Sequence, residues 1–273
     1  MKYTLQSIKY ILKNFWYIVP FAVLPAAFFA YSMDEVSIRC LMQTVFGEET
    51  ELHFHHFFNA ISVLNFASWQ NVLSGALGVA LLVPCVALLM ALLEKHMRIG
   101  KRTFNGIFSK LNDNLLSTIG YAVLLLIVYE LWALLTSTLV FCAFQIPVLA
   151  LAYTLAVLVF LAMHVVLIYI VGTIYLWLPC MQITGFRALE ALHYSYQLMS
   201  PVKWHILTGQ IVGLLSMEVL LCVCVLFVPS SITFLGLTVV FTFLVLLFCV
   251  RMQIAYFDRD HIERADLNKY GRF

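Results

Sequence analysis

TLQSIKYILKN, residues 4–14, is a short basic segment that leads directly into the apolar run FWYIVPFAVLPAAFFAY, residues 15–31. The same order recurs after two further basic segments, Thr103–Asn114 and Thr184–Lys203. Within each segment apolar residues return every three or four positions, which predicts an amphipathic helix. Such helices are too polar to span a bilayer. We expect each to lie along the membrane interface and then to turn sharply into a span, in the second copy at Asn112–Asn114.

The composition is that of a membrane protein. Of the 273 residues, 63% are hydrophobic and 11% charged, and the mean hydropathy is +0.96. A soluble domain is about 45–50% apolar and about 25% charged. This excess of apolar residues predicts that lipid covers much of the surface. There is no basic stripe of the kind that binds nucleic acid.

Six apolar runs are long enough to cross a bilayer core, which takes about 20 residues. They are Phe15–Tyr31, Trp69–Leu93, Leu115–Phe144, Pro147–Leu178, Trp204–Val228 and Ile232–Tyr256. We therefore predict an all-α polytopic membrane protein with six transmembrane helices, arranged as three hairpins that each follow a cytoplasmic interfacial helix. Residues 1–273 would form a single domain, with repeats at approximately 1–95, 96–180 and 181–257 and a short tail helix at 258–273.

The basic residues predict the orientation. They flank the spans on one side, and Arg39 alone falls on the other. By the positive-inside rule both termini are cytoplasmic. The acidic loop Ser32–Ser68, with an expected amphipathic helix at Phe57–Phe66, would then lie outside. The cations that close the chain are Arg251, Arg259, Arg264, Lys269 and Arg272.

The third basic segment also carries a family resemblance. ALEALHYSYQLM at residues 188–199, followed by Lys203 and Trp204, resembles a stretch of poorly characterised bacterial multipass proteins. These are related to the membrane domain of some glycerophosphodiester phosphodiesterases. The resemblance implies a bacterial cytoplasmic membrane and a multipass fold. It implies no reaction, because nothing in this chain corresponds to the phosphodiesterase catalytic domain.

Two carboxylates lie deep inside predicted spans, Glu130 in the third and Glu218 in the fifth. An ionised carboxylate at mid-bilayer costs at least about 2.5–3.5 kcal/mol, so these groups should face the protein interior. His164 in the fourth span should sit at the depth of Glu130 if the hairpin turns at Pro147, and we predict that the two approach, directly or through water. Glu130, His164 and Glu218 form either a substrate or proton site or structural interhelical hydrogen bonds. The expected partners of Glu218 are Ser216, Thr238 and Thr242.

Two other sets of residues suggest ligands. Cations on and beside the basic segments are expected to contact lipid headgroups, so the expected partners are the bilayer and its anionic lipids. They are Lys9, Lys13, Lys101, Arg102, Lys110, Arg187 and Lys203. Glu51, His53 and His55 are weak metal candidates, because three residues on one short segment rarely complete a site. We therefore expect no metal and no other cofactor.

These patterns favour a non-catalytic, transport-related protein, either a small permease or the membrane partner of a transport system. The alternative is a membrane scaffold or lipid-interacting assembly factor, which the basic helices favour. An enzyme is not expected, since the chain has no Ser/His/Asp set, HExxH motif or phosphate-binding glycine loop. A cavity reaching Glu130 or Glu218 would favour transport, whereas lipid in surface grooves of a filled bundle would favour the alternative.

Overall fold

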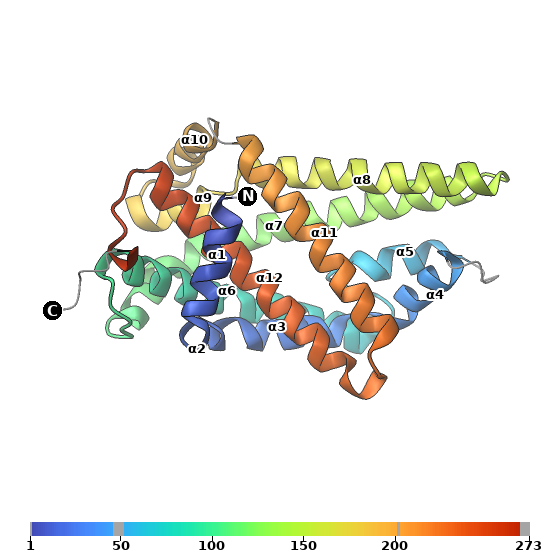
Figure 1. Ribbon diagram of the computed structural model, residues 1–273, viewed down its shortest axis with the longest axis horizontal. Coiled ribbons are helices and arrows are strands. Elements are labelled where there is room, and N and C mark those ends of the chain that lie inside the picture. Colours follow the sequence, from blue (N-terminus) through green and yellow to red (C-terminus); the bar gives the residue numbers. More distant parts are fainter. Residues whose placement is uncertain (1, 46–51, 201–202, 268–273) are drawn as a thin grey trace.

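The computed structural model describes residues 2–45, 52–200 and 203–267, and all regular structure within these ranges is helical (Figure 1). The longer helices are α1 (Lys2–Lys13), α3 (Pro20–Ser32), α4 (Glu35–Val45), α5 (Phe54–Ile61), α6 (Trp69–Ile99), α7 (Ile107–Phe144), α8 (Leu149–Thr173), α10 (Ala188–Met199), α11 (Lys203–Phe227) and α12 (Ser230–Arg259). The short turns are α2 (Phe15–Ile18), α9 (Trp177–Pro179), the π-helical η1 (Cys180–Thr184) and the 3₁₀-helical η3 (Ala265–Leu267). The predicted all-α class is confirmed.

Five helices in the described ranges are long and apolar enough to cross a membrane, and a bent pair of helices would raise the number to six. Four of the five are α6, α7, α11 and α12. The fifth is α8 with the turns that follow it, up to Thr184. They account for the second to sixth apolar runs. This part of the prediction succeeds because length and hydropathy suffice to make such a run helical in lipid.

The first predicted span, by contrast, is broken. Asn14 separates α1 from α2, and Pro20 opens α3, which has 13 residues. At 1.5 Å per residue such a helix is about 20 Å long, shorter than the roughly 30 Å hydrocarbon core. α4 continues the path after a bend of 60°. The loop after it holds α5, which begins and ends earlier than the helix predicted at residues 57–66.

The largest core lies where α1 crosses α12 and where α3 and α6 pack beside it (Figure 1). In α12 most residues from Val245 to Phe257 are buried. Tyr256, Phe257 and Tyr175 are fully enclosed. The first and last described elements, α1 and η3, lie toward this end of the molecule, which also carries α9, α10 and the α6–α7 connection. We call it the packed end.

The α7–α8 hairpin extends away from the packed end (Figure 1). Its outer surface is apolar and open: Leu139, Leu149 and Leu158 are 46%, 68% and 59% exposed. A surface of exposed leucines on two long helices is what a bilayer, rather than water, accommodates. The hairpin thus joins the rest of the protein mainly through the contacts of α7 with α5 and α6 and of α8 with α11.

Two of the three segments predicted as interfacial helices contain a separate helix, and the second does not. The first is α1 and the third contains α10, both separate helices. The second does not exist as a unit: α7 starts at Ile107, after Gly106 in the left-handed region at φ 71°, and runs unbroken past Asn112–Asn114. Polar residues alone do not end a helix, so the predicted turn there is wrong. The predicted tail helix is also wrong, because residues 260–267 hold only η3; residues 268–273 lie outside the described ranges.

α1 packs with a more polar face than its apolar stripe suggests. Leu5 and Leu12 of that stripe are 59% and 67% exposed, whereas Tyr3, Ser7 and Tyr10 are buried. The Tyr10 hydroxyl lies 2.5 Å from Nδ1 of His96 at the end of α6. The exposed leucines remain available to lipid, while the hydroxyl-bearing face fastens α1 to the packed end.

Candidate functional site

The structure brings two of the three predicted membrane-embedded ionisable residues together. His164 of α8 and Glu218 of α11 meet with 2.8 Å between Nε2 and Oε1. The His164 side chain is 1% exposed and that of Glu218 is 28% exposed. The imidazole is therefore enclosed by protein, while the carboxylate lies at the edge of the enclosure.

The other nitrogen of the His164 ring is also engaged. Nδ1 lies 2.8 Å from the carbonyl oxygen of Phe160, one helical turn earlier. The ring packs edge-on against Trp132 of α7, with 4.9 Å between centroids, and lies tilted against Phe160 at 4.2 Å. Trp132 is itself fixed, because its indole N–H donates to the Met163 carbonyl at 2.7 Å. These contacts hold the imidazole in one orientation toward Glu218.

The predicted pairing of His164 with Glu130 is wrong, because both ring nitrogens have other partners. The expected depth of His164 within the α7–α8 hairpin agrees with its contact with Trp132. Depth alone could not indicate that α11 packs against α8. The expected hydroxyl partners of Glu218 are wrong too. Each of them donates to a carbonyl of its own helix: Ser216 to Val212, Thr238 to Phe234, and Thr242 to Thr238.

Glu130 holds the connection between α5 and α6. Its carboxylate accepts hydrogen bonds from the Ser62 hydroxyl at 2.7 Å and from the amides of Val63 and Leu64 at 2.9 and 3.1 Å. On the other side of this connection the Val63 carbonyl approaches α6 so closely that a Cβ at Gly75 would lie 2.4 Å from its oxygen. Glu130 therefore satisfies the amides of an irregular segment that is clamped between two helices, a structural role.

The predicted headgroup cations are not equivalent. Lys9, Lys13, Lys101 and Arg187 are exposed. Arg102 is bound to the protein itself, donating to the Asn14 side chain and to the Lys13 carbonyl, each at 2.8 Å. Lys203 lies 3.8 Å above the Tyr169 ring. Lys110 pairs with Glu94 at 2.8 Å.

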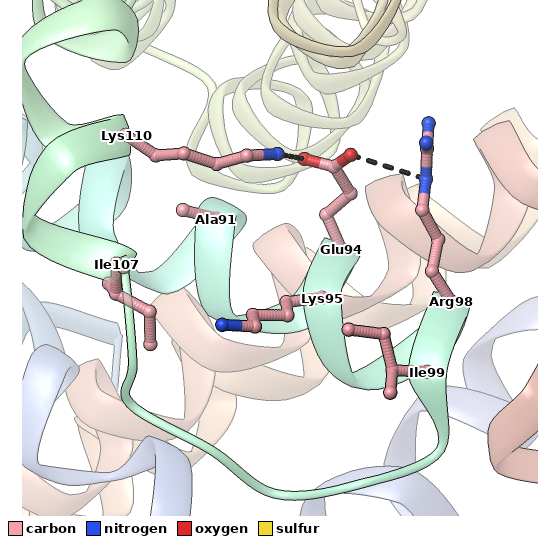
Figure 2. A pocket seen from close by; sticks show the side chains of 8 residues that line it. Ala91, Glu94, Lys95, Arg98, Ile99, Ile107 and Lys110 are labelled. Atoms are coloured by element: carbon pink, nitrogen blue, oxygen red, sulfur yellow. Dashed lines mark hydrogen bonds and ion pairs between the residues drawn. The ribbon is translucent and has the colours of Figure 1, made fainter.

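Glu94 was not among the site residues predicted from the sequence. It is 5% exposed at the end of α6 and makes ion pairs with Arg98 at 3.2 Å and with Lys110 at 2.8 Å (Figure 2). A pocket of about 230 Å³ lies beside it. A usable signal existed, because Glu94 is the only carboxylate among the many cations of residues 94–110 and stands four positions before Arg98.

Arg251 was predicted as a chain-closing cation, yet it is 6% exposed inside the packed end. Its guanidinium donates to the Tyr175 hydroxyl at 3.1 Å and to the Gly209 carbonyl at 3.0 Å. It thereby ties α12 to α11 and to the turn after α8. Its position near the end of the last apolar run had suggested that Arg251 contacts solvent. In the structure Arg251 lies about two turns before the end of α12.

The metal candidates in the outer loop are not assembled into a site. Glu51 lies outside the described residues. His53 and His55 stack with 5.5 Å between centroids, and no group of three or more metal-binding side chains is placed to hold an ion within the described ranges. His56 lies 3.8 Å from the Cys40 sulfur. Burial, followed by the neighbouring histidines, lowers the pKa of His56 below its ordinary value.

Two pockets are candidate ligand sites. One is the Glu94 pocket, and the other, of about 20 Å³, lies beside Gly172 and Lys203. Neither is lined by Glu130, His164 or Glu218, so neither meets the criterion of a cavity at the buried carboxylates. Both pockets therefore lie away from the ionisable pair.

Comparison with family models, with curated proteins and with solved structures finds no match to this chain. The resemblance of residues 188–204 to bacterial multipass proteins therefore stays a prediction. The functional interpretation rests on the site itself.

Proposed function

We propose that this is a non-catalytic, transport-related integral membrane protein in which the His164–Glu218 pair binds a proton. The observation that carries the proposal is the 2.8 Å contact between two ionisable side chains on different apolar helices. Ionisable residues inside a membrane are costly and are commonly found in proton relays and ion pathways. The protein would act as a small permease or as the membrane partner of a transport system.

The hydrogen-bond pattern supports a proton as the bound species. The Phe160 carbonyl can only accept, so Nδ1 of His164 carries a hydrogen. A proton must then also lie between Nε2 and the Glu218 oxygen, either as imidazolium with carboxylate or as imidazole with carboxylic acid. Removal of this proton would set a lone pair against a carboxylate, and the contact would no longer be attractive.

The arrangement of the helices indicates how loss of the shared proton would change the distance between α8 and α11. α8 and α11 approach closely at Gly172, where an added Cβ would lie 2.3 Å from the Leu207 side chain. From that end they diverge (Figure 1), and His164 and Glu218 join them further along. Loss of the shared proton would release this link and favour a wider separation of the α7–α8 hairpin. A ligand shifts such an equilibrium only through its different affinity for the two states, and the proton has that difference here.

The proposed cargo is small for the same structural reasons. Neither of these two pockets borders the pair, which favours a proton over an organic solute as the bound species. The alternative role, a scaffold or lipid-interacting factor, is favoured instead by the position of the Glu94 pocket at the ends of the spans. Lipid binding there is compatible with either role.

The proposal includes a topology in the bacterial cytoplasmic membrane. We count the bent α3–α4 pair as one span, which would make six crossings. Six crossings arranged as three hairpins would keep both termini on one side. The cation-rich α6–α7 connection lies toward the same end as α1 and η3 (Figure 1), which supports a cytoplasmic location for that end. Labelling of single cysteines by an impermeant maleimide tests this: Lys101→Cys should be protected in intact cells and Phe66→Cys should react. The reverse pattern would contradict the orientation.

Proton flux tests the function. Purified protein is reconstituted in vesicles that contain a pH-sensitive dye, and acidification is followed after a potential is imposed with valinomycin. We expect wild-type flux above that of protein-free vesicles, and a return to that leak in His164→Gln and Glu218→Gln. Glu130→Gln is the matched control, because it removes the same charge from a neighbouring span without touching the pair. Wild-type flux equal to the leak would defeat the transport proposal and favour the scaffold.

A further inference from the structure

The Glu94 pocket is enclosed by the last turns of α6, the first turns of α7 and the connection between them (Figure 2). Its volume is about 230 Å³. The residues that line it are Ala91, Glu94, Lys95, Arg98, Ile99, Gly106, Ile107 and Lys110. Charged groups and aliphatic side chains therefore share one cavity at the end of two membrane-spanning helices.

Positive charge is in excess in this pocket. Lys95, Arg98 and Lys110 bring three cations, and Glu94 is the single carboxylate among the lining residues. Glu94 pairs with Arg98 and Lys110, so two cations share one negative charge. The Lys95 ammonium donates to the Asn105 carbonyl, a neutral acceptor. The pocket thus keeps an excess of two positive charges, which favours an anion.

Apolar side chains also line this pocket, namely Ala91, Ile99 and Ile107. Ile99 is 52% exposed, and Phe108, the residue that follows Ile107 in α7, is 74% exposed. An inorganic anion would use the cations and leave these side chains uncovered. An amphiphile with a negative headgroup satisfies both features, and the ends of spans are where headgroups lie.

We propose that the pocket between α6 and α7 binds the phosphate of an anionic phospholipid, with its acyl chains over the exposed side chains of Ile99 and Phe108. Lys95, Arg98 and Lys110 contact the phosphate. Glu94 is a positioning residue, which holds Arg98 and Lys110 toward the cavity when lipid is absent and competes with the phosphate for them. The inference does not depend on proton binding at the His164–Glu218 pair, which lies on other helices.

Binding of a short-chain phosphatidylglycerol to the detergent-solubilised full chain, followed by native mass spectrometry, tests the site. We expect Lys95→Gln and Lys110→Gln each to weaken binding about fivefold, the effect of one cation near an anionic headgroup. Lys101→Gln is the matched control, since Lys101 lies in the same connection but does not line the pocket. A similar loss in Lys101→Gln would overturn the site in favour of diffuse attraction.

Two further measurements identify the ligand and distinguish a lost binding site from a misfolded protein. Phosphatidylcholine should bind clearly less well, and inorganic phosphate should not displace the lipid; displacement at equal concentration would show that a free phosphate suffices. Glu94→Gln should tighten lipid binding, because it removes the competing carboxylate. This gain cannot come from a damaged fold. Weaker binding in Glu94→Gln with an unchanged melting temperature would contradict the assignment.

Discussion

The packed end and the α7–α8 hairpin differ in how much of each helix the protein itself covers. In the most apolar stretches of α6 and α12, 44% of residues are buried, compared with 28% in α7 and 17% in α11. The ionisable residues of the proposed proton site belong to the less covered helices α8 and α11. The packed end therefore serves as the stable frame, and the less covered helices are the part whose position can change.

The largest expected effect contrasts an aromatic residue of the packed end with one of α11, a helix that the protein itself covers less. Phe257→Ala at the packed end removes a fully buried ring and should lower the free energy of unfolding by about 3–5 kcal/mol. Phe227→Ala at the end of α11 removes a ring that is 75% exposed and should leave stability nearly unchanged. Thermal unfolding in one detergent compares them. Equal losses would mean that the two regions are not distinct in stability.

The second contrast concerns the contact between α8 and α11. Gly172→Ala places a methyl group 2.3 Å from Leu207, whose side chain must move, so we expect a loss of about 1–3 kcal/mol. Gly120→Ala in α7 meets nothing within 4 Å and should gain up to about 1 kcal/mol of helix propensity. Melting temperatures that shift in the same direction for both variants would show that Gly172 is not a close contact.

The buried carboxylates give a third, smaller contrast. Glu130→Gln weakens the hydrogen bonds to residues 62–64 and should cost about 1–2 kcal/mol, with faster amide exchange at Val63 and Leu64. Glu218→Gln should leave exchange at those amides unchanged. Hydrogen exchange followed by mass spectrometry resolves the two. Faster exchange at Val63 and Leu64 in Glu218→Gln would indicate that the carboxylates act as one unit.

The smallest expected effect lies in the attachment of α10 to α12. The hydrogen bond from Tyr194 to Asp260, more than burial, raises the pKa of Tyr194 to about 12. The folded state keeps the phenol proton more tightly than the unfolded state does. Its contribution to stability is therefore complete below pH 10 and is lost as the pH rises toward 12. Tyr194→Phe should show a shallower decline of melting temperature between pH 10 and 12; an unchanged decline would assign the loss to other groups.

Hydropathy was sufficient to predict the long apolar helices α6, α7, α8, α11 and α12, because lipid leaves an apolar run no other stable conformation. It failed at residues 15–31, where a break at Val19, just before Pro20, separates α2 from α3 within a run that is apolar throughout. It failed again at Asn112–Asn114, because polar residues at a membrane surface are compatible with a continuing helix. Local composition thus indicated where lipid lies and did not indicate where helices begin and bend.

The site was only half predictable for a related reason. The mid-span positions of Glu130, His164 and Glu218 marked them as groups in need of partners. Pairing by depth considers only helices that are neighbours in sequence, so it joined His164 to Glu130. The partner proved to be Glu218, 54 residues away, because α11 packs against α8. Similarly, the burial of Glu94 and Arg251 depends on contacts that only the assembled bundle creates.

The central claim is that a shared proton joins α8 and α11. The most direct test is the distance between spin labels at Leu151→Cys and Phe227→Cys, measured by pulsed electron paramagnetic resonance in a background without the native cysteines. Both positions are exposed and lie beyond the pair. The account predicts a longer distance at alkaline pH in the wild-type pair and no dependence on pH in Glu218→Gln. A distance that is independent of pH in both, or equally dependent in both, would contradict it.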